Sequence, residues 1–211
     1  AGSPRYSLRA RNNEFAKLDV LEQGIKEAHE RNKKFFLTVN TLPHNSKLKT
    51  FVADMEPLIA MKPDALIMAD PGLIMTVREK WPEMPIHLSV QANTTNYWGV
   101  KFWQNIGVER IILSRELSME EIAEIRQECP DIELEVFIHG ALCIAYSGRC
   151  LLSGYFNHRD PNQGTCTNSC RWDYKVHNAV ESDAGDAQLL QGFNFEKAQE
   201  EANQNFEGIN G

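Results

Sequence analysis

The chain has 211 residues, enough for one substantial domain and too few for two comfortable ones. Hydrophobic residues make up 42% and charged residues 24%, which is the composition of a folded protein and excludes a disordered chain. No apolar run approaches the roughly 20 residues of a membrane span, and the first residues lack the apolar core of a secretory signal. We therefore expect a cytoplasmic protein with no membrane partner.

The formal net charge of −7 is unevenly distributed. Residues 181–211 contain seven acidic residues and one Lys, a net of −6, which leaves −1 for residues 1–180. A strongly acidic surface would repel nucleic acid, but a nearly neutral body does not. The charge pattern therefore leaves RNA open as a substrate.

Short β-rich apolar runs alternate with helical patterns, and successive runs start 21 to 30 residues apart. That spacing is the length of a strand, a helix and two loops. Ser118 lies three residues before Glu121, a capping box that begins the last helix. The predicted strands are residues 35–40, 65–70, 86–91, 110–115 and 134–140, and the predicted helices are residues 13–31, 47–61, 73–80, 94–106 and 118–128.

This alternation predicts a parallel sheet covered by helices, either doubly wound or barrel-like. A doubly wound sheet often carries a Gly-rich phosphate loop, and the chain has no G-x-G-x-x-G. A (β/α) barrel places its chemistry at the carboxyl ends of its strands, so polar strand ends favour it. The polar residues at the predicted strand ends are Asn40, Thr41, Asp70, Ser89, Gln91, Asn93, Ser114, Arg115 and His139.

We therefore predict an α/β fold, a parallel (β/α) TIM-barrel-like domain with a Cys-rich segment after the last strand. Five repeats cannot close an eight-stranded barrel, so we expect an incomplete barrel from a longer protein. Open sheet edges predict that such a fragment can pair with a second copy as a homodimer. The predicted parts are a partial barrel over residues 1–142, a Cys-rich segment of the same domain over residues 143–178, and an acidic tail or linker over residues 179–211.

Four of the five cysteines form the pattern C-x6-C-x15-C-x3-C within 28 residues, at Cys143, Cys150, Cys166 and Cys170. Cys129, beside Pro130 at the end of a predicted helix, is interpreted as structural. Disulfides suit an oxidising compartment, which nothing in the sequence indicates. Structural zinc favours paired C-x2-4-C knuckles. An iron–sulfur cluster tolerates irregular spacing.

A cysteine nucleophile paired with His139 or His158 is a fourth interpretation, which leaves three thiols unexplained. Spacing alone favours an iron–sulfur cluster among these four without deciding between them.

Several stretches carry a resemblance to a known family. They are residues 135–143 (EVFIHGALC), 146–154 (YSGRCLLSG) and 157–172 (NHRDPNQGTCTNSCRW), with residues 6–15, 64–72 and 87–93 before them. Together they resemble the collagenase-like peptidase family, peptidase family U32, and within it the members that form 5-hydroxyuridine in tRNA. The resemblance extends from residue 1 to about residue 178.

This resemblance implies a (β/α)-barrel-like domain and a [4Fe–4S] cluster. By motif position, the cluster ligands are Cys143, Cys150, Cys166 and Cys170. It also implies tRNA as a partner and hydroxylation of the wobble uridine at carbon 5, in a pathway that depends on prephenate rather than molecular oxygen.

Within that expectation, the strand ends would bind a small dicarboxylate such as prephenate. Arg115 and Arg149 are the first candidates, because a guanidinium grips a carboxylate through two parallel hydrogen bonds. His139 and Arg115 are the candidate catalytic residues; His139 could transfer a proton or bond a cluster sulfur. The candidate substrate-binding set is Asn40, Asp70, Gln91, Arg115 and Arg149.

Two other functions stay open. The family's inherited label predicts a collagenase-like cysteine or metal-independent peptidase, although the chain has no G-x-S-x-G or H-E-x-x-H motif. The chain could instead be a non-catalytic binding module in a tRNA hydroxylation pathway.

Overall fold

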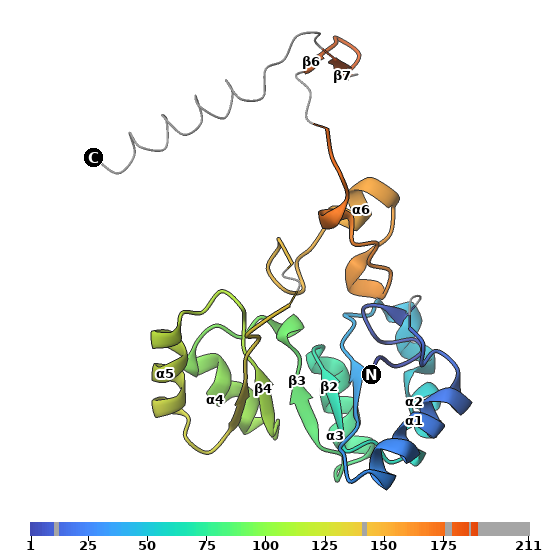
Figure 1. Cartoon of the computed structure of the whole chain (residues 1–211), viewed down its shortest axis with the longest axis vertical. Coiled ribbons are helices and arrows are strands. Elements are labelled where there is room, and N and C mark those ends of the chain that lie inside the picture. Colours follow the sequence, from blue (N-terminus) through green and yellow to red (C-terminus); the bar gives the residue numbers. More distant parts are fainter. Residues whose placement is uncertain (11–12, 141–142, 176–178, 186, 190–211) are drawn as a thin grey trace. The chain divides into compact units, whose positions relative to one another are not determined.

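The computed structural model describes residues 1–10, 13–140, 143–175, 179–185 and 187–189 (Figure 1). The chain divides into two compact units, Ala1–Cys170 and Arg171–Gly211. The second unit contains an antiparallel pair, β6 (Ala179–Glu181) and β7 (Ala187–Leu189). Most of the predicted acidic tail lies outside the described residues. Among those described, no helix combines the length and apolar character needed to cross a membrane.

The first unit is built on five parallel strands in the order β1-β2-β3-β4-β5. The strands are β1 (Phe36–Val39), β2 (Ala65–Met68), β3 (Ile86–Leu88), β4 (Arg110–Ile112) and β5 (Glu133–Glu135). The helices are α1 (Leu18–Glu30), α2 (Asn45–Ala60), α3 (Pro71–Lys80), α4 (Tyr97–Asn105) and α5 (Met119–Glu128). The predicted parallel α/β fold is confirmed, and the strand order does not reverse, as it would in a doubly wound sheet.

The hydrophobic core lies between the helices and one face of this sheet. In β1, Leu37 and Val39 are fully buried, whereas Phe36 and Thr38 are only partly buried. The parallel register carries the alternation across the sheet, since Leu37 pairs with Leu66. The helices add apolar side chains to this core, among them Leu21, Ile25, Phe51, Met55, Leu73, Val77, Val100 and Ile125.

The opposite face of the sheet carries a connected row of polar and aromatic side chains. The rings of Phe36 and His87 meet edge to face at 4.7 Å, and the Arg110 guanidinium lies 5.3 Å from the Phe36 ring centre. Arg110 also pairs with Glu133 at 2.7 Å and with Glu135 at 3.4 Å. Burial, reinforced by the Arg110 charge, lowers the pKa of His87 to about 4, so the ring is neutral at pH 7.

The amino-terminal residues extend the sheet beyond β1. Gly2 forms a parallel bridge with Thr38, whose N–H donates to the Ala1 carbonyl at 2.7 Å. The buried Tyr6 then fixes the following loop, because its hydroxyl donates to Asp54 at 2.7 Å. This pairing lays residues 4–10 beside the carboxyl end of β1, where Thr41 N–H donates to the Tyr6 carbonyl.

The strands end earlier than their apolar runs predict, most clearly in β5. Leu113 N–H bonds the Glu135 carbonyl, and β5 ends at Glu135. His139 therefore lies in an exposed turn four residues beyond the strand, and the prediction that it closes the fifth strand is wrong.

Acid is expected to destabilise the sheet through His87. The pKa of His87 is about 4 in the folded chain and about 6.5 in the unfolded chain. Between these pH values the unfolded chain therefore binds more protons than the folded chain. The free energy of unfolding then decreases as the pH falls from about 6.5 to about 4. We expect His87→Leu to lose less melting temperature than the parent between about pH 7 and about pH 5, measured by circular dichroism. The control His139→Gln, at an exposed position, should keep the parental dependence. Equal losses in His87→Leu and the parent would contradict the prediction.

Candidate functional site at the carboxyl edge of the sheet

Polar side chains that follow β1, β3 and β4 meet at the carboxyl edge of the sheet. The Asn40 amide donates to the Ser89 hydroxyl at 3.1 Å and its oxygen accepts from Leu8 N–H at 3.3 Å. Ser89 in turn accepts from Gln91 N–H at 3.2 Å, which begins a single 3-10 turn over Val90–Ala92. These strand ends share one edge because all five strands are parallel and end on the same side.

Asp70 has a structural partner at this edge. Its carboxylate accepts from Leu73 N–H at 2.9 Å and so caps α3, with Pro71 at the first helical position. The carboxylate is therefore engaged by the helix amino terminus.

The Cys-rich segment folds onto this edge. Asn162 accepts from Leu42 N–H through its carbonyl at 3.1 Å and from the Gln91 amide through its side-chain oxygen at 3.1 Å. The Lys47 ammonium donates to the Gln163 carbonyl at 2.7 Å, and the Gln163 amide donates back to the Leu42 carbonyl. Gln91, one of the predicted substrate-binding residues, thus holds the segment against the sheet.

Two glycines allow the segment to approach the sheet backbone closely. Gly148 has φ +75°, and a Cβ there would lie 2.5 Å from the Gln91 carbonyl oxygen. Gly164 has φ +93°, and a Cβ there would lie 2.8 Å from the Ser7 carbonyl oxygen. Both positions combine a backbone conformation that favours glycine with no room for a side chain.

Arg115 lies under the segment, where its guanidinium donates to the Ser147 hydroxyl at 2.8 Å. The neighbouring carboxylate, Glu116, forms no ion pair with Arg115 among the described residues and accepts from the Ser114 hydroxyl instead. Arg115 Nε is buried and unpaired within the described structure, as are the hydroxyls of Thr41 and Thr94. Buried polar groups ordinarily have partners, so these three atoms are unsatisfied positions after β1, β3 and β4.

A cavity of about 350 Å³ opens beside the carboxyl end of β1. Its lining residues are Gly2, Ser7, Leu8, Arg9, Asn13, Thr38 and Asn40. Sequence reasoning selected only Asn40 for this region. Arg9 belongs to a short basic stretch, but its neighbourhood depends on the pairing of residues 1–3 with β1, which no local pattern indicates.

A polar cluster, formed by hydrogen bonds among Ser153, Asn157, Thr167 and Ser169, holds the Cys-rich segment together around α6 (Leu152–Asn157). The Ser153 hydroxyl accepts from Thr167 N–H at 3.1 Å, and the Asn157 amide donates to Thr167 and Ser169 hydroxyls at 3.1 Å each. Ser153 and Ser169 are almost completely buried. The polar cluster therefore fixes the backbone that flanks Cys166 and precedes Cys170.

All five cysteines are free thiols. Cys129 is buried, and burial raises the pKa of its thiol, as expected of a structural residue. In the Cys-rich segment, Cys143 and Cys170 are exposed while Cys150 and Cys166 are partly buried. Within the described ranges, no three His, Cys, Asp or Glu side chains lie close enough together to hold a metal ion.

The donor chemistry of the segment nevertheless fits an iron–sulfur cluster. Thiolates are the usual ligands of such clusters, and none of the four thiols is consumed by a disulfide or by the core. Binding one centre requires the sulfur atoms to move together from their present positions. Cys143 and Cys170 are exposed, so no core packing opposes the movement of these two.

A family model described as Peptidase family U32 matches residues 1–206. The chain belongs to peptidase family U32. Tyr6, Asn40, Gln91 and the Cys-rich segment all lie inside the matched range, so the whole carboxyl edge is part of the family region.

Curated relatives of this U32 protein include RNA-modifying proteins. The tRNA hydroxylation protein P of Escherichia coli (strain K12) is 66% identical over 185 residues, which cover 88% of this chain and 41% of that protein. The 23S rRNA 5-hydroxycytidine synthase of the same organism is 34% identical over 83% of this chain and 26% of its own length. The chain thus spans about two fifths of the length of tRNA hydroxylation protein P.

A solved structure of the U32 peptidase Mk0906 is also similar. It aligns with a TM-score of 0.48 and 16% identity, over 55% of this chain and 50% of that one.

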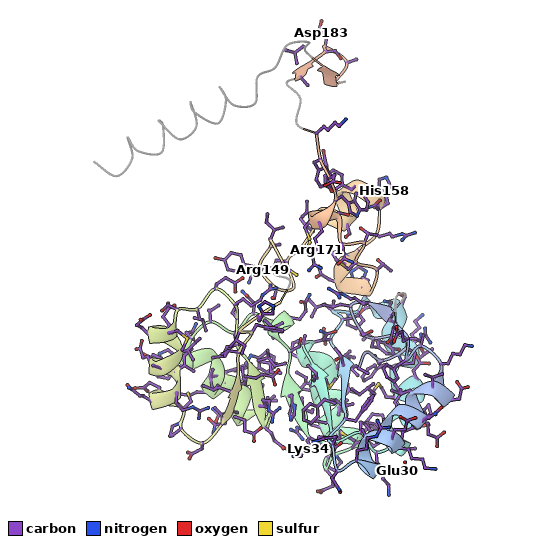
Figure 2. The ribbon with its side chains drawn as sticks, in the orientation of Figure 1. Glu30, Lys34, Arg149, His158, Arg171 and Asp183 are labelled. Atoms are coloured by element: carbon purple, nitrogen blue, oxygen red, sulfur yellow. The ribbon has the colours of Figure 1, made fainter. Side chains whose placement is uncertain are left out.

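The remaining predicted site residues of this U32 protein are exposed. Arg149 lies in the loop before α6, and His158 follows α6 (Figure 2). His139 and Cys143, the pair considered for a peptidase dyad, are both exposed and share no hydrogen bond in the described structure.

Docking of the Cys-rich segment should depend on its two close-approach glycines. We expect Gly148→Ala and Gly164→Ala each to cost about 1–3 kcal/mol, because a side chain there adds backbone strain and a clash with a carbonyl. Chemical denaturation and limited proteolysis after residue 143 would measure the loss. Gly154→Ala is the matched control, since its Cβ would meet nothing nearer than 4.0 Å. If all three variants behave alike, close backbone approach does not hold the segment.

Proposed function

We propose that this protein is an RNA-modifying enzyme that hydroxylates carbon 5 of the wobble uridine in tRNA. The observation that carries the proposal is 66% identity to a tRNA hydroxylation protein across 88% of the chain. The rRNA relative supports the same chemistry, because its name describes hydroxylation of a pyrimidine at carbon 5.

In this reaction the C–H bond at carbon 5 is replaced by a C–O bond. With water as the oxygen source, the base and the water together release two protons, which pass to solvent, and two electrons, which pass to an external two-electron acceptor. We propose that the pathway uses prephenate and not molecular oxygen. When bound, an iron–sulfur cluster supplies stepwise electron transfer.

We propose that the four clustered thiols hold a [4Fe–4S] cluster, with Cys143, Cys150, Cys166 and Cys170 as ligands. Three features support this assignment. The thiols are free, their segment docks on the carboxyl edge of the sheet, and the polar cluster fixes the backbone beside Cys166 and Cys170. The small residues around them let backbone N–H groups approach sulfur and stabilise its charge.

We propose that the small dicarboxylate binds at the same edge through Arg115. Its buried Nε is unpaired in the described structure, and Thr41 and Thr94 present two further unpaired hydroxyls. One Arg115 nitrogen already bonds Ser147, which fixes the guanidinium plane. The remaining donors can then grip a carboxylate in a defined orientation.

The peptidase alternative has less support. A cysteine peptidase needs a base within hydrogen-bond reach of its nucleophile, and His139 and Cys143 do not have that contact. The binding-module alternative differs from the enzyme only in whether the chain performs the chemistry, so activity measurements decide between them.

Iron binding is tested by anaerobic purification followed by iron and sulfide analysis and visible spectroscopy. We expect Cys→Ser at each of positions 143, 150, 166 and 170 to lower iron content several-fold, because each removes a ligand. Cys129→Ser, in the core and away from the segment, should keep the parental iron content per folded molecule. A colourless protein with stoichiometric zinc would refute the cluster.

The hydroxylation itself is tested in cells. Deleting the gene for the full-length protein should lower 5-hydroxyuridine in tRNA, measured by mass spectrometry of nucleosides, and the full-length wild type should restore it. Full-length Arg115→Lys should restore less, because Lys keeps the charge but loses the two-point grip on a carboxylate. Unchanged 5-hydroxyuridine in a strain with no redundant pathway would rule out the proposed function. Peptidase activity that survives loss of all four clustered cysteines would favour the older label.

A further inference from the structure

The stretch around α6 has an unusual charge pattern for this acidic chain. Residues 136–159 contain no Asp or Glu, while Arg149, His158 and Arg159 lie among them. The next carboxylate, Asp160, is engaged as a cap, because it accepts from Asn162 N–H at 2.8 Å. The surface of this stretch is therefore free of competing negative side chains.

The Arg159 guanidinium is exposed and has no hydrogen-bond or ion-pair partner among the residues the structure describes. Several other arginines of the first unit, though not Arg9 or Arg149, have internal partners among the described residues. Arg5 makes two hydrogen bonds to Asp54, Arg110 pairs with Glu133, and Arg126 donates to backbone carbonyls. An exposed, uncommitted guanidinium is available to bind an external anion.

Two exposed aromatic rings belong to the helix that precedes this cation. Tyr155 is 80% exposed and Phe156 is 44% exposed, and their ring centres are 5.1 Å apart in an edge-to-face pair. Arg159 follows Tyr155 by four positions and lies two residues beyond the end of α6, where its N–H bonds the Ser153 carbonyl. The hydrogen bonds of Ser153 and Asn157 in the polar cluster anchor α6, so the backbone that carries these two rings is fixed.

We propose that unpaired nucleotides of RNA bind to a surface at the end of α6. This α6 surface consists of Tyr155, Phe156, His158 and Arg159. Tyr155 stacks on a base and Arg159 binds a phosphate, the combination that recurs where proteins hold single-stranded nucleic acid. Charge complementarity favours a polyanion over an apolar protein partner, and the exposed rings favour RNA over an acidic protein because bases stack on them. The inference rests on the proposed function, and it adds the place where the RNA is held.

Binding is measured by fluorescence anisotropy with a labelled tRNA transcript and this chain. Tyr155→Ala should weaken binding by about 5- to 150-fold, the cost of losing one stacked base. Tyr155→Trp should retain binding, because it preserves a stacking ring. Arg159→Ala should flatten the dependence of log affinity on log salt by about 0.7 to 0.9, the value of one phosphate contact.

Trp98→Ala is the matched control, since Trp98 is 70% exposed on α4, outside the Cys-rich segment. It should leave both affinity and salt dependence unchanged. The proposal is overturned if Tyr155→Ala and Trp98→Ala behave alike, or if the parent chain binds no RNA. It is also overturned if Tyr155→Ala changes only sedimentation, which would make the surface a contact between copies.

The surface and the proposed function can fail separately. If the full-length Tyr155→Ala protein binds tRNA normally and restores 5-hydroxyuridine, the α6 surface is wrong and the function stands. If α6 variants lose RNA binding but deletion of the gene leaves 5-hydroxyuridine unchanged, the surface stands and the function falls.

Discussion

The arrangement of the candidate site depends on close backbone contact between the Cys-rich segment and the carboxyl edge of the sheet. Gly148 and Gly164 permit that contact, and Asn162 bonds both the loop after β1 and the turn after β3. Without it, the four clustered thiols would lie on a segment with no defined relation to the strand ends. Arg115 would also lose Ser147, the partner that orients its guanidinium.

The two faces of the sheet carry different kinds of side chain. One face packs against the helices through alternating apolar residues such as Leu37 and Leu66. On the other face, the Phe36 ring contacts the His87 ring and the Arg110 guanidinium, and Arg110 pairs with Glu133. The candidate site lies at the carboxyl edge, because parallel strands bring the ends of successive repeats to one side.

Sequence reasoning located the repeats but not the ends of the strands. Apolar runs predicted all five strands, yet β5 ends at Glu135, five residues before the end of its predicted strand at residue 140. Periodicity cannot report which neighbour a backbone group will choose. For the same reason His139 was predicted at a strand end and lies in an exposed turn.

The sequence by itself determined the α/β repeat, the polar strand ends, the clustered thiols and the family, because periodicity, residue type and spacing are local properties. Only the tertiary structure decided that Gln91 holds the Cys-rich segment and that Arg9 lines a cavity beside Asn40. Each of these roles depends on a partner far away in the chain. A long-range partner is selected by packing and hydrogen-bond satisfaction across the whole fold, which no short stretch of sequence records.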